Sequence, residues 1–136
     1  MKRAHVPTNA IVSFYCTCIR SILEYSCEVF HFSLPKYLSD NIERFQKRVL
    51  SIILPGKSYS DWLSFTSLNS LHDRRYQLTK KTFNSIVANR SHKLHDFLPD
   101  VNVSSYFLRN PRDFNIPQCK TNRFKQSFLP SCASDF

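Results

Sequence analysis

The sequence predicts a mainly α-helical protein, a small bundle of about three longer helices with short helices between them, followed by an irregular tail. Apolar residues recur at helical spacing over residues 8–30, 36–54 and 71–89. Prolines in this part fall near the expected helix ends. From Pro99 onward, prolines cluster and aromatic residues alternate with polar ones. We therefore expect a helical body over residues 1–98 and a basic, aromatic tail over residues 99–136.

The first helix is expected to enter at Pro7 and to run to Phe30. Its apolar residues leave only a narrow polar edge, so this helix should be the most buried element. Arg20 and Glu24 lie one turn apart on that edge and should pair on the surface.

The second helix has the most regular amphipathic pattern of the chain. Its apolar face is expected to comprise Leu38, Ile42, Phe45, Val49, Ile52 and Ile53. Pro35 suits the first helical turn, and Ser39 is an alternative cap. Pro55 and Gly56 should end the helix, because proline cannot continue the hydrogen-bond ladder and glycine tolerates a left-handed turn.

A short helical turn is expected over residues 60–65, with Trp62 and Phe65 pointing inward. The next long helix, over residues 71–89, should bury a stripe made of Leu71, Leu78, Phe83, Ile86 and Val87. Arg75 falls inside this stripe and must reach its edge or find a carboxylate, since an unpaired buried charge is costly. The candidate carboxylates are Glu24, Glu43 and Asp73.

The tail is expected to pack partly on the helices and to contain short extended pieces near residues 106–109 and 125–128. Its expected anchors are Phe107, Phe114, Phe124 and Phe128.

Composition points to a soluble, intracellular protein. Lys and Arg outnumber Asp and Glu 19 to 10, giving a net charge of +9, which favours polyanions such as nucleic acid but also simply aids solubility. No apolar run reaches the roughly 18 residues of a membrane span, and no secretory leader is evident. The five cysteines lack the spacing of a secreted disulfide scaffold. A nuclear or cytoplasmic protein with reduced thiols, not a secreted or membrane one, is expected.

Several segments resemble reverse transcriptases of LINE-type (non-LTR, jockey-like) retrotransposons, in the region after the polymerase active site. The resemblance lies in residues 38–56, LSDNIERFQKRVLSIILPG, and in residues 71–75, LHDRR. It extends to residues 2–7, 14–20, 92–99, 107–112 and 121–128. Ungapped blocks in one order are more specific than a single motif. The resemblance implies a detached thumb and connector piece whose frame begins inside a domain of the parent enzyme.

The catalytic part of such a polymerase is absent from the sequence. Polymerases clamp two divalent ions with paired aspartates, whereas the acidic residues here are all single. We therefore expect no enzyme activity, no cofactor and no small-molecule substrate. The family usually has proline where this chain has Ser21 and Glu28, so the first helix should be straighter than in the parent enzymes.

Two sets of residues are candidates for metal binding: Cys16, Cys18, Cys27 and His31, and His92, His95, Cys119 and Cys132. Structural zinc sites usually show paired cysteine knuckles, and positions two apart on a helix point in different directions. We expect no metal site.

Two basic sets could contact nucleic acid. The first is the polar face of the second long helix, extended by the third, and comprises Arg44, Lys47, Arg48, Arg74 and Lys81. The resemblance implies that such a thumb grips the duplex backbone, so these cations would contact phosphates without reading sequence. An ordinary solvated helix face explains the same pattern.

The second basic set lies in the tail and comprises Arg109, Arg112, Lys120, Arg123 and Lys125. Cations interleaved with aromatics suit single strands, where bases stack and phosphates need counter-charge. Anchoring of the tail is the competing explanation for the aromatics.

The leading hypothesis is a non-enzymatic remnant with weak affinity for RNA, RNA–DNA hybrid or DNA backbones. The alternatives are a protein-interaction module that self-associates through exposed apolar surface, and a translated relic without function.

Overall fold

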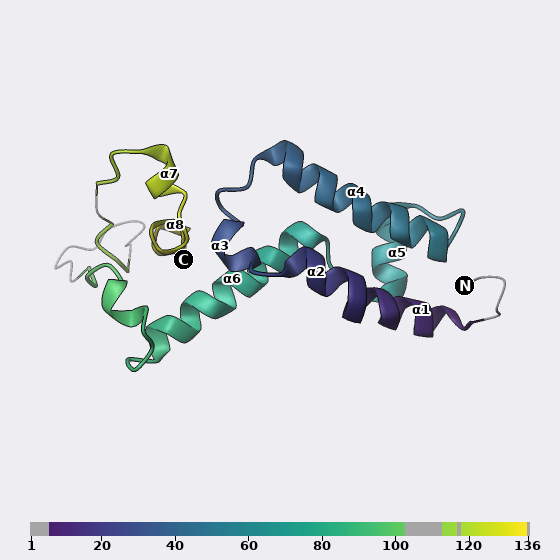
Figure 1. Ribbon diagram of the computed structural model, residues 1–136, viewed down its shortest axis with the longest axis horizontal. Helices are drawn as coiled ribbons and strands as arrows, with labels where there is room; N and C mark the ends of the chain where they lie inside the picture. The colour runs from purple at the N-terminus through teal and green to yellow at the C-terminus, as the bar shows by residue number, and fades with distance from the viewer. Residues whose placement is uncertain (1–5, 103–112, 117, 136) are drawn as a thin grey trace. The chain divides into compact units, whose positions relative to one another are not determined.

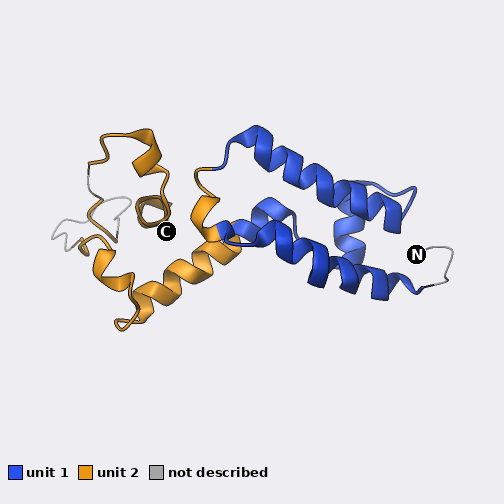
Figure 2. Ribbon diagram, viewed as in Figure 1, with its two compact units in different colours: residues 1–27, 34–75 blue, residues 28–33, 76–136 orange. Residues whose placement is uncertain are grey.

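The computed structural model describes residues 6–102, 113–116 and 118–135. The chain folds into two compact units, which we describe one at a time (Figure 2). Unit 1 comprises Met1–Cys27 and Leu34–Arg75, and unit 2 comprises Glu28–Ser33 and Tyr76–Phe136. Unit 2 thus combines residues 28–33 and 76–98 of the predicted body with the predicted tail.

The predicted mainly α-helical class is confirmed. Helices follow one another along the chain (Figure 1), and within the described residues β-structure is limited to an isolated antiparallel bridge between Val101 and Phe114. No helix in this part of the chain is long and apolar enough to cross a bilayer.

The first predicted helix is not one straight helix. It begins as α1 (Thr8–Phe14), continues as the π-helix η2 (Tyr15–Arg20) and ends as α2 (Ser21–Glu24). The chain then breaks at Ser26, whose φ of 52° lies in the left-handed region, before α3 (Cys27–Phe30) begins. A left-handed residue there stops a right-handed helix, so the expectation of one continuous helix to Phe30 is wrong. Whether the stretch is straighter than in the parent enzymes stays a prediction.

The expectation that this stretch is the most buried element is also wrong. α1 has no buried residue, and Ile22 is 74% exposed. Helix α6 (Leu71–Ala88) buries more of its length, through Leu71, Arg75, Thr79, Phe83 and Ile86. The bounds of α6 agree with the predicted helix, although Val87 of its predicted stripe is exposed.

Helix α4 (Lys36–Ile53) begins after Pro35 and ends before Pro55 and Gly56, as predicted. Gly56 adopts a φ of 85°, which glycine reaches without steric cost. Ser39 is not a cap, because it lies inside α4, where its hydroxyl accepts a hydrogen bond from Arg75.

The buried face of α4 differs from the predicted one. It comprises Gln46, Leu50 and Ile53, whereas Leu38 and Ile52 are exposed and Phe45 is 54% exposed. The buried face of α4 is therefore rotated about the helix axis relative to the stripe of apolar residues that the sequence predicted.

Helix α5 (Tyr59–Thr66) starts with a capping box between Ser58 and Asp61. Hydrogen bonds from Ser58 lower the pKa of the Asp61 carboxyl. Trp62 lies half-buried, as expected, and its indole Nε1 donates to the Leu54 carbonyl at 2.7 Å. Phe65, expected inside, is 58% exposed, and the Lys57 Nζ lies 4.7 Å from its ring centroid.

The core of unit 1 forms where α1, η2, α4 and α5 meet. Tyr15, Leu50 and Ile53 are buried there, and Ile11, Ile19, Val49, Trp62 and Leu63 are among the residues packed around them.

Unit 2 has its own apolar core around Phe83. The Phe83 ring meets Phe114 at 5.8 Å and Phe128 at 6.4 Å between centroids, both edge to face. Cys132 and Ala133 complete the buried cluster. Phe114 and Phe128 are therefore anchors, as predicted, whereas Phe124 is exposed and Phe107 lies outside the described residues.

The tail is more helical than predicted. The 3-10 turn η3 (His95–Phe97) precedes it, and α7 (Asn122–Lys125) and α8 (Phe128–Asp135) lie within it. The extended piece expected at residues 125–128 is wrong, and the one at residues 106–109 lies outside the described residues. Pro130 is compatible with α8 because it occupies the first turn.

Candidate nucleic-acid interface

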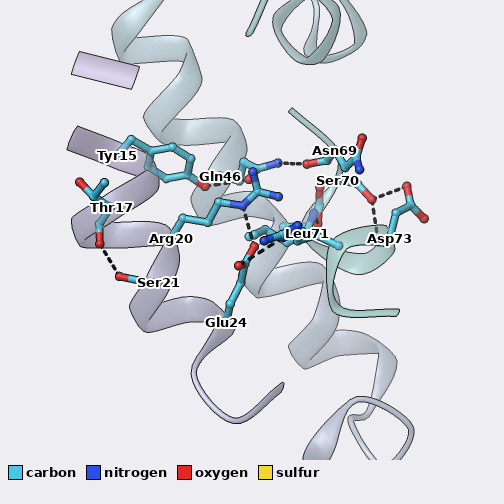
Figure 3. Close-up of polar contacts among 12 residues, drawn as sticks. Tyr15, Thr17, Arg20, Ser21, Glu24, Gln46, Asn69, Ser70, Leu71 and Asp73 are labelled. Atoms are coloured by element: carbon cyan, nitrogen blue, oxygen red, sulfur yellow. Dashed lines mark hydrogen bonds and ion pairs between the residues drawn. The ribbon is translucent and has the colours of Figure 1, made fainter. Parts of the chain in front are cut away.

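A buried polar network in unit 1 determines which face of α4 is buried (Figure 3). Gln46 is fully buried, and its Oε1 accepts from the Tyr15 hydroxyl at 2.7 Å. Its Nε2 donates to the Tyr59 hydroxyl at 2.9 Å and to the Asn69 carbonyl at 3.1 Å. Because these bonds satisfy both ends of the amide, a polar residue can occupy the centre of the buried face.

Glu43 extends this network one turn away on α4. Its carboxylate accepts from the Tyr59 hydroxyl and, at 3.0 Å, from the backbone N–H of Leu71 at the start of α6. An anion at a helix N-terminus is stabilised by the free N–H groups and the helix dipole. Burial, with the hydrogen bond to Glu43, raises the pKa of Tyr59, and burial raises the pKa of Tyr15.

Arg75 is 1% exposed, and its Nη2 donates to the Ser39 hydroxyl at 2.8 Å. Burial lowers the pKa of this guanidinium, while the charges of Glu43 and Glu24 oppose that shift. Asp73, the third predicted candidate, instead forms a cap at the α6 start, where it accepts from the Ser70 hydroxyl at 2.7 Å.

Arg20 and Glu24 pair as predicted, with 2.6 Å between Arg20 Nε and Glu24 Oε1. The pair is not on the surface, however, because both side chains are largely buried. The second Glu24 oxygen lies 3.6 Å from Arg74 Nε. Arg74, predicted as a phosphate contact, is therefore already partly neutralised.

The opposite side of α4 carries Arg44, Lys47 and Arg48, all exposed and spaced at i, i+3 and i+4. Arg44 Nη1 lies 3.4 Å from the Asn41 side-chain oxygen. Lys47 Nζ lies 4.8 Å from the Tyr59 ring centroid. Within the described residues, none of the three forms an ion pair with a carboxylate. We call these three residues the α4 basic face.

The remaining predicted contacts, apart from Arg74, belong to unit 2 or fall outside the described residues. Lys81 lies exposed on the part of α6 that belongs to unit 2. Arg123 and Lys125 lie exposed on α7 of unit 2, as does Lys120 just before it. Arg109 and Arg112 lie outside the described residues.

Sequence reasoning missed one surface feature of each unit. In unit 1, an apolar groove of about 360 Å³ runs between the first helical stretch and α4 and is lined by Ile11, Phe14, Tyr15, Ile19, Val49, Ile52 and Ile53. In unit 2, an apolar hollow includes Phe97, which is 71% exposed. The sequence signals for this second feature are Phe97, which follows charged and polar residues before Pro99, and the tail aromatics Phe124 and Phe128, which line the same hollow.

Among the described residues, no group of three or more His, Cys, Asp or Glu side chains is arranged to hold a metal ion. Comparison with protein-family models, with curated proteins and with solved structures finds no match.

Proposed function

We propose that the chain binds nucleic-acid backbones through the α4 basic face, without reading sequence. The observation that carries this proposal is the exposure of Arg44, Lys47 and Arg48 on one face without carboxylate partners in the described part of the chain. Cations held on a rigid helix can contact phosphates, and such contacts need no base-specific geometry. The net charge of +9 adds long-range attraction to any polyanion.

The resemblance to LINE-type reverse transcriptases supports the same proposal. According to this resemblance, α4 belongs to a detached thumb piece that retained its contacts with the nucleic-acid backbone and lost the polymerase centre. The preferred ligands would then be RNA–DNA hybrid or duplex, and the affinity would be weak because few phosphates are contacted.

Replacing Arg44, Lys47 and Arg48 together by glutamine is expected to weaken binding to duplex DNA and to RNA–DNA hybrid of any sequence. Glutamine has nearly the same helix propensity, so α4 should persist. The slope of log affinity against log salt should fall by about two to three units, because each phosphate contact releases counterions. Fluorescence anisotropy over a salt series, with circular dichroism to verify folding, measures both quantities.

A matched control is the triple replacement of Lys80, Arg90 and Lys93 by glutamine, at exposed positions of unit 2 outside the predicted nucleic-acid contacts. It removes charge without touching α4, so the salt slope should change less. If the triple variant binds both duplexes as the parent does at moderate salt, the α4 basic face is only solvated and the proposal is wrong.

The second candidate function is self-association through the unit 1 groove. Phe14 and Ile52 are exposed at this groove, and Phe45 continues the same stripe of α4. A second copy could insert these side chains in a two-fold contact, which is the common geometry of homodimers. Light scattering should then detect a dimer that Ile52→Asp converts to monomer. A parent protein that is monomeric at high micromolar concentration would exclude this candidate.

A further inference from the structure

Unit 2 contains an open apolar hollow that has no role in the function proposed for the α4 basic face. It has a volume of about 530 Å³, and its lining comprises Val29, Leu94, Phe97, Pro99, Phe124, Ser127, Phe128, Leu129 and Pro130. Phe128 packs on the Phe83 ring below, so one wall is fixed by the core. Phe97 and Phe124, in contrast, are 71% and 51% exposed. Two aromatic rings of one hollow thus remain accessible.

The segment that carries Phe124 is basic, whereas exposed Asp96 and Asp100 adjoin Phe97 and Pro99 of the same lining. Residues 118–131 carry Lys120, Arg123 and Lys125, all exposed, and no acidic residue. Arg123 and Lys125 are the chain neighbours of Phe124. Thr121 caps the short helix by accepting from the Phe124 backbone N–H at 3.3 Å, which fixes the backbone that carries the ring and both cations.

We infer that this hollow binds an unpaired base of a single-stranded nucleic acid, with the base stacked on Phe97 or Phe124 and the flanking phosphates beside Arg123 and Lys125. Exposed aromatic rings next to cations are the combination that single-strand binding proteins use. A base inside a duplex is covered on both faces by its neighbours, so only an unpaired base can enter.

The chemistry of the lining indicates that the site does not select a base. The only side-chain hydroxyl in it belongs to Ser127, and this group donates to the Phe124 carbonyl at 2.7 Å. Base selection needs hydrogen-bonding groups aimed at base edges, whereas stacking accepts any base. Arg123 and Lys125, the chain neighbours of the lining residue Phe124, also favour a nucleotide over an uncharged apolar ligand, which gains nothing from these cations.

This inference rests on the proposed function in one respect only, that the protein binds nucleic acid. It concerns another unit, other side chains and unpaired rather than duplex ligands. The α4 triple variant should therefore retain stacking, and loss of stacking should leave duplex binding unchanged.

The ligand itself offers the first test. Anisotropy at fixed salt compares a fluorescent 12-residue thymidine strand with an abasic strand of equal length and charge. Stacking predicts tighter binding of the strand with bases, by about 5- to 150-fold. Equal affinities would mean that only phosphates are bound, and would overturn the inference.

The protein offers the second test, through Phe97→Leu together with Phe124→Leu. Leucine keeps the surface apolar but has no aromatic face, and both positions are exposed enough for the fold to tolerate it. The preference for bases over abasic backbone should disappear, while duplex affinity stays at the parent value. Phe65→Leu, at an equally exposed ring of unit 1, is the matched control and should change neither quantity.

Two results would overturn the inference in this second test. One is a double variant that still prefers the strand with bases. The other is a parent protein whose preference disappears in Phe65→Leu, because the stacking ring would then lie in unit 1. If duplex binding fails in the α4 variant while the base preference remains, the two sites are separate, as inferred.

Discussion

Replacing Glu43 by alanine is expected to lower the free energy of unfolding by about 3–5 kcal/mol. This is the usual loss when one partner of a buried pair of charges is removed. The carboxylate accepts hydrogen bonds from Tyr59 and from the Leu71 backbone at the α6 start, and its charge favours the ionised form of buried Arg75. Without it, the Tyr59 hydroxyl and the Leu71 N–H lose their acceptor, and the guanidinium loses its strongest compensating charge.

Urea unfolding followed by fluorescence measures this change directly. Trp62 is the only tryptophan and belongs to unit 1, so its emission reports on the affected unit. Asp40→Ala is the matched control, because it removes an exposed acid of the same helix and should alter stability by less than about 0.5 kcal/mol.

A double variant separates charge from packing. If buried charge causes the loss, adding Arg75→Met to Glu43→Ala should recover part of the stability, since the buried guanidinium that lost the Glu43 charge is then removed. A Glu43→Ala variant as stable as Asp40→Ala would show that Glu43 does not organise unit 1.

Elements bounded by strong local signals could be predicted from the sequence. Proline and glycine marked both ends of α4, and the bounds of α6 followed from its apolar repeat. The break at Ser26 carried no such signal, because serine rarely adopts a left-handed conformation and only tertiary structure holds it there. The π-helical insertion in η2 likewise shifts the helical register without a characteristic residue type.

Gln46 explains why the buried face of α4 could not be predicted. A pattern of apolar residues assigns glutamine to the surface, but three hydrogen bonds from distant parts of unit 1 make its burial favourable. Phe45 and Ile52 were therefore assigned to a core that they do not enter. Long-range partners of polar groups are not visible in local periodicity.

The candidate sites, too, include features that local sequence predicts and features that depend on distant contacts. The residues of the α4 basic face are exposed, as the helical repeat predicts. Charged side chains rarely enter a core, whichever apolar residues of the helix form it. The pairing of Arg74 with Glu24 and the gathering of Phe97 and Phe124 at one hollow depend on chain segments far apart in sequence. For the tail aromatics, the sequence left base stacking and anchoring of the tail as alternatives. Phe114 and Phe128 are anchors, whereas Phe124 is accessible.

Replacing Phe83 by alanine is expected to destabilise unit 2 by about 3–5 kcal/mol, the usual loss when a buried phenylalanine leaves a cavity. Phe83 is buried, and its ring meets both Phe114 and Phe128 edge to face. Cys132 belongs to the same buried cluster, and burial raises the pKa of its thiol to about 12. The thiol should therefore react with alkylating reagents only when unit 2 opens.

Site-resolved mass spectrometry after alkylation at pH 8 measures that opening. In the parent, exposed Cys18 should react quickly and Cys132 hardly at all. Phe83→Ala should accelerate the reaction of Cys132 by about 10²- to 4 × 10³-fold, because each 1.4 kcal/mol corresponds to a factor of ten. Val87→Ala, one turn along α6 at an exposed position, should leave the rate nearly unchanged. If Phe83→Ala also leaves it unchanged, the aromatic cluster does not hold unit 2 together, and the wall that Phe128 gives to the hollow would lack its support. Reactivity of Cys132 thus tests the core on which the inferred stacking site depends, without requiring any nucleic acid.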